Sequence, residues 1–109
     1  MRTLKFIVSG RTLIQDPSCD FTGLFPSENE KLAAEFQFSN EWEDTIKVVA
    51  FYSVLGAEYP PQVLDEGNKC IFPTEAVMRP VFRMQLLGEV SGAVIQTNVL
   101  SIYQKGGKK

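Results

Sequence analysis

Apolar and polar residues alternate in several short segments of this chain, and no other feature restricts its fold as much. Residues 32–38 give the clearest case, because Leu32, Ala34, Phe36 and Phe38 share one parity. Successive side chains of a β-strand point to opposite faces, so this segment is predicted to be a strand with one buried and one hydrated face. Turn-forming residues separate such segments at spacings of about ten residues, which is typical of an all-β domain.

The predicted strands are short and evenly spaced. They cover residues 4–8, 12–15, 32–38, 45–55, 70–72, 81–87 and 93–104. About seven strands at this spacing predict an immunoglobulin-like antiparallel β-sandwich, and no helical pattern is long enough for parallel crossovers. One short helical turn is expected over residues 74–78, with Thr74 as its N-cap and Pro80 enforcing its end.

Length and charge narrow the function. The 109 residues correspond to one domain, predicted over residues 1–104, followed by a flexible basic tail at 105–109. The formal net charge is -2, so we expect no nucleic-acid partner. No apolar segment approaches the roughly 20 residues that cross a bilayer, and no secretory signal is visible. We therefore expect no membrane partner and a protein made in the cytoplasm.

The residue types that usually carry catalysis or bind metals are scarce. Histidine is absent, which removes the commonest general base and a common zinc ligand. The glycines are dispersed at turns rather than clustered before a helix, so no phosphate-binding loop is predicted. Cys19 and Cys70 alone cannot complete a structural zinc site. One disulfide between them is possible on number alone, and we favour two reduced thiols over it. We expect no enzyme activity, no metal and no cofactor.

The single tryptophan has two interpretations. Glu41, Glu43 and Asp44 flank Trp42, and paired carboxylates beside an aromatic ring also occur in sugar-cleaving sites. A lone tryptophan is more often buried, and we favour a core position at a corner of the sandwich, with the acids hydrating the bend. The predicted core residues are Phe36, Phe38, Trp42 and Phe51.

A second group of residues is predicted to contact a partner. The candidates are Phe21, Leu24, Phe25, Tyr59, Pro60 and Pro61. The first three interrupt a long stretch of turn-forming residues, and we expect the loop to tuck these apolar side chains inward. The last three mark a sheet edge, because two prolines cannot serve a central ladder. As an alternative, Tyr52, Tyr59 and Tyr103 would form an aromatic ledge for a sugar or a protein.

Five segments, taken in order, carry a resemblance. They are 36–42 (FQFSNEW), 45–51 (TIKVVAF), 70–77 (CIFPTEAV), 82–88 (FRMQLLG) and 95–100 (IQTNVL), the last with its Thr97-Asn98 step. In this order they resemble small β-sandwich proteins and modules of tailed bacteriophages of Firmicutes, over residues 33–102. Longer members of that group continue into a fibre or coiled coil, whereas this sequence ends at a lysine-rich tail.

The resemblance implies a structural protein of the phage virion. Such a protein would be a capsid decoration protein or a tail or baseplate accessory, and it would dock on phage capsid or tail proteins. Homo-oligomers or many docked copies would multiply weak contacts. Two alternatives stay open, namely a carbohydrate- or receptor-binding module on the particle surface and a phage-encoded inhibitor of a host defence protein.

Overall fold

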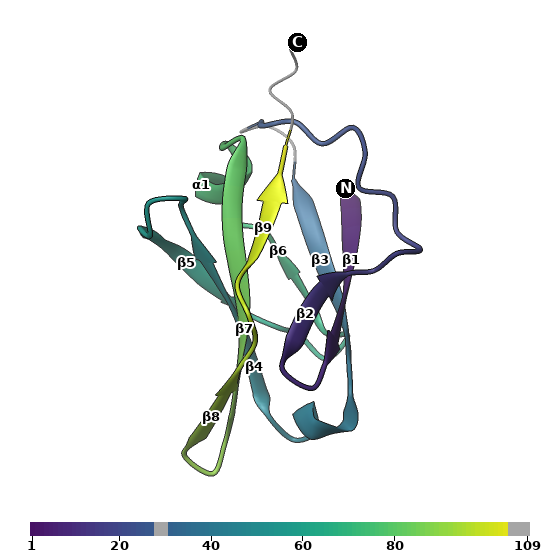
Figure 1. Ribbon diagram of the computed structural model, residues 1–109, viewed down its shortest axis with the longest axis vertical. Coiled ribbons are helices and arrows are strands. Elements are labelled where there is room, and N and C mark those ends of the chain that lie inside the picture. The colour runs from purple at the N-terminus through teal and green to yellow at the C-terminus, as the bar shows by residue number, and fades with distance from the viewer. Residues whose placement is uncertain (28–30, 105–109) are drawn as a thin grey trace.

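Two β-sheets pack face to face in the computed structural model, which describes residues 1–27 and 31–104 (Figure 1). The first sheet contains, in spatial order, β2 (Thr12–Gln15), β1 (Arg2–Ser9), β3 (Leu32–Phe38) and β6 (Lys69–Ile71). The second contains β5 (Glu58–Val63), β4 (Ile46–Tyr52) and β7 (Val81–Val90), with β8 (Ala93–Gln96) and β9 (Leu100–Tyr103) both paired to β7. The tail predicted at 105–109 lies outside the described residues.

The prediction of an all-β sandwich is confirmed, with two differences in detail. The described residues form nine strands rather than about seven, because residues 58–63 make a complete strand and the last predicted strand is divided. One pairing is parallel, since β1 and β3 run side by side with Leu4 opposite Ala34 and Phe6 opposite Phe36. Between β1 and β3, the described residues form β2 and a loop rather than a crossover helix, so a parallel pairing did not require the helical pattern that the sequence lacks.

A break at residues 97–99 divides the last predicted strand into β8 and β9. In β8 the odd-numbered Ile95 packs against the core, whereas in β9 the even-numbered Ile102 is buried. At the break, Thr97 Oγ1 accepts a hydrogen bond from the Leu86 N–H (3.1 Å) and donates one to the Asn98 carbonyl (2.8 Å). The prediction of one continuous strand is therefore wrong, because a buried threonine hydroxyl takes part in the ladder and changes which parity faces inward.

The two helical segments are each about one turn long. The 3₁₀ turn η1 (Asn40–Trp42) follows β3, and the helix α1 (Thr74–Val77) follows β6. The predicted turn at 74–78 is present, but Pro73 rather than Thr74 occupies the N-cap position, and Thr74 is the first helical residue. No helix in the described part of the chain is long and apolar enough to cross a lipid bilayer.

Trp42 is the last residue of η1, and its indole packs into the core of the sandwich. Its side chain is fully buried, its Nε1 donates a hydrogen bond to the Gly10 carbonyl over 2.7 Å, and its ring lies 5.3 Å from that of Phe38. Gly88 on β7 crosses directly over the ring, because a Cβ at this position would lie 2.7 Å from Trp42 Cζ3. Close approach of the backbone to the indole thus requires glycine at position 88.

Phenylalanines from both sheets form the centre of the core. Phe6 on β1 stacks on Phe36 on β3, with ring centroids 5.2 Å apart. Phe51 on β4 and Phe82 on β7 lie 5.5 Å and 5.6 Å from Phe72, which also lies 6.5 Å from Phe6. Phe72 therefore joins the aromatic residues of the two sheets, and burying each such side chain contributes about 1.5–3 kcal/mol.

Local hydrogen bonds hold the loop that follows β2. The Arg2 guanidinium donates to the carbonyls of Asp20 (2.9 Å) and Thr22 (2.6 Å). The Asp16 carboxylate accepts bonds from the backbone N–H and hydroxyl of Ser18, and the Asp20 carboxylate accepts the equivalent pair from Thr22. These bonds lower the pKa of both carboxyl groups, chiefly through the Ser18 backbone N–H for Asp16 and the Thr22 hydroxyl for Asp20.

Candidate functional site

An open cleft of about 480 Å³ lies between the β4–β5 hairpin and the connection from α1 to β7. The hairpin wall consists of Ser53, Val54, Leu55 and Ala57 at its tip and Tyr59 on β5. The opposite wall consists of Arg79, Pro80 and Val81. We call this site the hairpin cleft. It is predominantly apolar, which is the usual character of sites that bind other molecules in proteins.

Hydrogen bonds centred on Ser53 make the hairpin tip rigid. The Ser53 hydroxyl accepts bonds from the N–H groups of Leu55 (3.2 Å) and Ala57 (3.0 Å), and the Ser53 N–H donates to the Ala57 carbonyl (2.8 Å). Gly56 adopts a φ of +92°, which side-chain-bearing residues rarely reach, so glycine allows the tight turn. The turn presents Leu55 with 94 % of its surface exposed.

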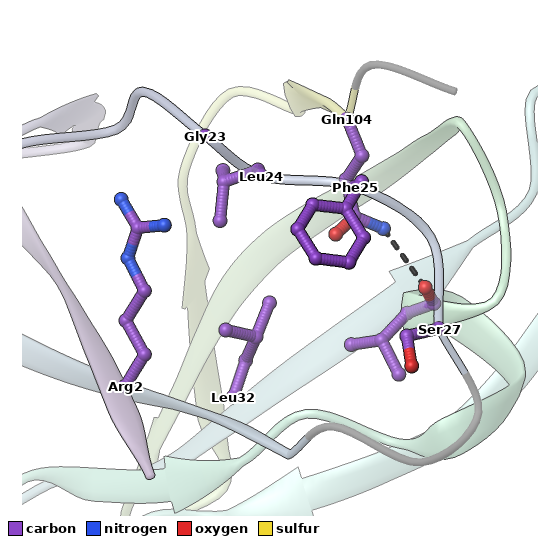
Figure 2. A pocket seen from close by; sticks show the side chains of 8 residues that line it. Arg2, Gly23, Leu24, Phe25, Ser27, Leu32 and Gln104 are labelled. Atoms are coloured by element: carbon purple, nitrogen blue, oxygen red, sulfur yellow. Dashed lines mark hydrogen bonds between the residues drawn. The ribbon is translucent and has the colours of Figure 1, made fainter. Parts of the chain in front are cut away.

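Gln104 fixes the opposite wall of the hairpin cleft. Its backbone N–H donates to the Pro80 carbonyl (2.7 Å), and its buried side-chain amide donates to the carbonyls of Val77 and Arg79, both at 2.9 Å. Figure 2 shows the bond to Val77 and the small cavity that Gln104 lines together with Phe25. Both walls of the cleft are therefore held by hydrogen bonds before any partner binds.

A second hollow of about 280 Å³ lies on the other side of the same hairpin tip. Ser53 lines both spaces, and the second is otherwise lined by Tyr52, Gly56, Arg83, Gln85 and Val99. We call it the outer hollow. The Gln85 amide donates to the Thr97 carbonyl (2.7 Å), which holds its side chain against the sheet.

Positive charge accompanies both spaces. Arg79 lines the hairpin cleft and Arg83 lines the outer hollow, and both side chains are exposed. No aspartate or glutamate is among the described residues that line either space. A ligand that carries a carboxylate would therefore meet an arginine on either side of the hairpin.

The predicted tyrosine ledge is not formed as a single surface. Tyr59 pairs with the buried Phe51, and Tyr52 pairs with Glu58, so the two tyrosines point to opposite sides of the second sheet. Tyr59 lines the hairpin cleft and Tyr52 lines the outer hollow. Tyr103 lies on β9 and is exposed, but it lines neither space in the described part of the chain.

The six predicted contact residues fall into different environments. Leu24 is buried, and Phe21 packs edge-to-face on Phe6 at 5.6 Å, so both belong to the core and its border. Their long loop therefore turns these apolar side chains inward, as the sequence predicted. Phe25 is half exposed, beside a cavity of about 20 Å³ under the loop (Figure 2). That space holds about one water molecule and no larger ligand.

The proline pair lies where a sheet edge was expected. β5 is an edge strand, and Pro60 and Pro61 are exposed on it. Tyr59, which precedes them, is partly buried in the hairpin cleft. Of the predicted contact residues, Tyr59 is thus the one that lines the larger cleft.

The predicted core residues lie inside the sandwich. Phe36, Trp42 and Phe51 are buried, and Phe38 is partly buried between Trp42 and the ammonium of Lys47, which lies 5.3 Å from its ring. The acids that flank Trp42 are exposed, and the indole is covered.

The two cysteines are free thiols in different settings. Burial, aided by the nearby negative charge of Asp65, raises the pKa of the Cys70 thiol to about 12. The sulfur of Cys19 accepts a hydrogen bond from the Lys5 N–H at 3.4 Å. Within residues 1–27 and 31–104, no three side chains of metal-binding type gather in one place.

Sequence analysis missed the hairpin tip and Arg79. Val54 and Leu55 were included in the predicted strand 45–55, although they stand directly before Gly56. Two apolar residues at a glycine turn are a signal of an exposed apolar tip. No sequence pattern marked Arg79 as a site residue, because only the folded chain brings it opposite the hairpin.

Comparison with known proteins identified no relative of this chain. No protein-family model, no curated protein and no solved structure matches the chain. The functional interpretation therefore depends on the geometry of the hairpin cleft and on the resemblance described above.

Proposed function

We propose that this chain is a non-enzymatic docking protein that forms a structural part of a tailed-phage particle. The observation that supports docking most strongly is Leu55, which is 94 % exposed at a hydrogen-bonded hairpin tip beside an apolar cleft. Single exposed leucines are common on protein surfaces, but one that borders a cleft with tyrosine and arginine side chains has the composition of an interface. The phage assignment is supported by the order of segments noted in the sequence.

The rigid hairpin favours binding in energetic terms. Covering Leu55 with a partner would contribute about 1.5–3 kcal/mol, and little entropy would be lost because the turn is already ordered. Tyr59 and Arg79 lie on opposite walls of the hairpin cleft, and both residue types are enriched among those that dominate binding energy. A partner that inserts between them would contact all three side chains.

The chemistry of the site defines the partner. The apolar walls accept an apolar side chain, and Arg79 and Arg83 accept a carboxylate on either side of the hairpin. We therefore propose that the partner is a phage capsid or tail protein that presents an exposed segment with an aliphatic or aromatic residue next to an aspartate or glutamate. The small size of the cleft predicts a weak single contact, which many copies on one particle would strengthen.

The carbohydrate alternative is less well supported. Stacking of a sugar on several rings needs those rings on one surface, and Tyr52 and Tyr59 point to opposite sides of the sheet. An inhibitor of a host protein would use the same kind of docking surface. The inhibitor and the virion protein would therefore differ in where the chain is found, not in the geometry of the site.

Quantitative mass spectrometry of purified phage particles tests the proposal. We expect the chain to be present, either in copies comparable to the major capsid protein or in the small number typical of a tail or baseplate part. Absence from intact, infectious particles, with the chain found instead in a complex with a host protein, would overturn the virion assignment in favour of an inhibitor.

Site-specific cross-linking tests the docking surface itself. A photoreactive phenylalanine analogue replaces Leu55 in one variant and Ile14 in another, and both variants are assembled into particles. Ile14 is a suitable control because it is an exposed apolar residue of β2, on the other sheet. We expect a discrete product with one capsid or tail protein from position 55 and none from position 14. Equal products from both would contradict the assignment of the hairpin cleft.

A further inference from the structure

The edges of the two sheets differ in how well they are protected. Unpaired backbone groups at a sheet edge can bind a strand of another chain, and proteins usually block them with proline, charge, short length or a covering group. β5 carries Pro60 and Pro61, and β6 is only three residues long and begins with Lys69. The edge of β2 is covered by the side chain of Asn98, whose amide forms hydrogen bonds with the N–H and the carbonyl of Leu13.

β8 is also short, with four residues, but it lacks the proline, charge and covering side chain that protect the other edges. Its sequence, AVIQ, contains no charged residue and no proline, and Val94 is 59 % exposed. It belongs to the β7–β8 hairpin, which extends past the rest of the sandwich at the lower end of Figure 1. β9 continues the same edge at the other end of β7, but there Ser101 is partly buried, and Gln104, which follows the strand, is buried beside the cavity that Leu24 and Phe25 line (Figure 2).

The register of β8 shows which of its backbone groups are free. The Thr97 N–H donates to the Leu86 carbonyl, so odd-numbered residues of this segment direct their backbone groups toward β7. The N–H and C=O groups of Val94 and Gln96 consequently point away from β7. No hydrogen bond joins them to another described residue, whereas the next residue of the same parity, Asn98, donates its N–H to the Arg11 carbonyl.

We propose that two copies of this chain associate by antiparallel pairing of β8 with β8 around a two-fold axis at Ile95. This register places Val94 of each copy opposite Gln96 of the other and uses all four free groups of each strand in ladder bonds. It also brings the two Ile95 side chains together on the core side, where Ile95 already packs against buried residues.

The second copy fits this edge better than an unrelated strand for two reasons. The strand is uncharged, so no like charges meet across the two-fold axis. The symmetric register also matches the free backbone groups, because Val94 of one copy meets Gln96 of the other on both sides of the axis. This association involves the end of the molecule that carries β8, so it is independent of docking through the hairpin cleft.

Sedimentation equilibrium of the purified full chain tests the proposal. Because only a short strand pairs, we expect weak association, with a mass that rises from 12.2 kDa toward twice that value as the concentration increases from about 10 µM to about 1 mM. Hydrogen exchange at the same concentrations should show increasing protection of the Val94 and Gln96 amides. The Glu58 amide, at the edge of β5, should not change. A constant mass of 12.2 kDa up to 1 mM would overturn the proposal.

Charge substitutions distinguish this interface from any other. In the double variant Val94→Lys with Gln96→Lys, four lysines face each other in pairs across the axis, so we expect a monomer. A matched double variant, Ile46→Lys with Val63→Lys, adds the same charge to exposed residues of β4 and β5, which do not border β8, and should still associate. Mixing the β8 lysine variant with Val94→Glu/Gln96→Glu should restore association. Association that survives the β8 lysines, or no rescue by the mixture, would place the interface elsewhere.

Discussion

The side chain of Asn98 pairs with the backbone of Leu13 as a neighbouring strand would. Its Oδ1 accepts a hydrogen bond from the Leu13 N–H at 2.7 Å, and its Nδ2 donates one to the Leu13 carbonyl at 3.2 Å. The two residues are 85 positions apart: Leu13 belongs to the first sheet, and Asn98 lies in the break between two strands of the second. One amide thus closes the open edge of β2 and ties it to the break between β8 and β9.

Replacing Asn98 with leucine, which has nearly the same shape, should destabilise the fold. Two backbone groups of β2 would lose their partner, at a cost of about 1–3 kcal/mol in the free energy of unfolding. Urea denaturation measures this change. Asn40→Leu serves as the control, because Asn40 is exposed and should change stability by less than about 0.5 kcal/mol. Equal effects of the two substitutions would show that the Asn98 amide contributes nothing specific.

Adding one methyl group at position 88 should also destabilise the protein. A Cβ on Gly88 would lie 2.7 Å from Cζ3 of the buried Trp42, so Gly88→Ala forces the indole or β7 to move. Overpacking of this kind costs about 1–3 kcal/mol. Combining it with Trp42→Phe, which removes the clashing atoms, should yield less than the sum of the two single losses. Additive losses in this double-mutant cycle would contradict a direct contact.

Cys70 should be slow to react in the folded state. Its thiol pKa is raised to about 12, so the thiolate is scarce at pH 8, whereas the unfolded chain has the ordinary value of 9.0. In a Cys19→Ser variant, we expect slow labelling by a disulfide reagent in buffer and fast labelling in denaturant. Because the raised pKa favours the neutral thiol in the folded state, the stability it contributes is complete below pH 9 and is lost as the pH rises toward 12. The free energy of unfolding is measured at pH 8 and at pH 11 for proteins with and without Cys70. The same change between the two pH values in both proteins would contradict this assignment.

The loop after β2 should loosen in acid. The pKa values of Asp16 and Asp20 are lowered below 3.8 by hydrogen bonds that need the ionised carboxylate. Their contribution is therefore present above the unfolded value of 3.8 and is lost as the pH falls through the lower folded values. NMR titration of the Ser18 and Thr22 amides should show both signals moving below pH 4. Midpoints at or above 3.8 would argue against these bonds.

Local patterns predicted individual elements more completely than their partners. The alternation in residues 32–38 located β3, and the proline pair located the edge strand β5, because burial of one face and loss of a ladder donor act within one segment. The parallel pairing of β1 with β3 depends on contacts between distant segments, so no local pattern specified it. The break at Thr97 was hidden for a similar reason, since its hydroxyl is bonded to Leu86 on another strand.

The candidate site was only partly predictable. Tyr59 was identified beside its prolines, but Arg79 joins the hairpin cleft only after Gln104 positions the chain between α1 and β7. Leu24 illustrates the opposite case, because an apolar residue in a loop is equally consistent with a partner contact and with a buried anchor. The turn-forming residues beside Leu24 in the sequence are compatible with either role, so they do not distinguish the two.

Incorporation of tip variants into particles tests the central claim, that the chain acts by docking through the β4–β5 hairpin. A phage that lacks the wild-type chain is supplied with Leu55→Asp or with Ile14→Asp, an exposed apolar control on the other sheet, after both variants are shown to fold. The copies per particle are then counted by mass spectrometry. We predict that Ile14→Asp is incorporated at the wild-type level and that Leu55→Asp is reduced at least tenfold, which corresponds to about 1.4 kcal/mol of lost contact. Equal incorporation of the two folded variants would contradict docking through this hairpin.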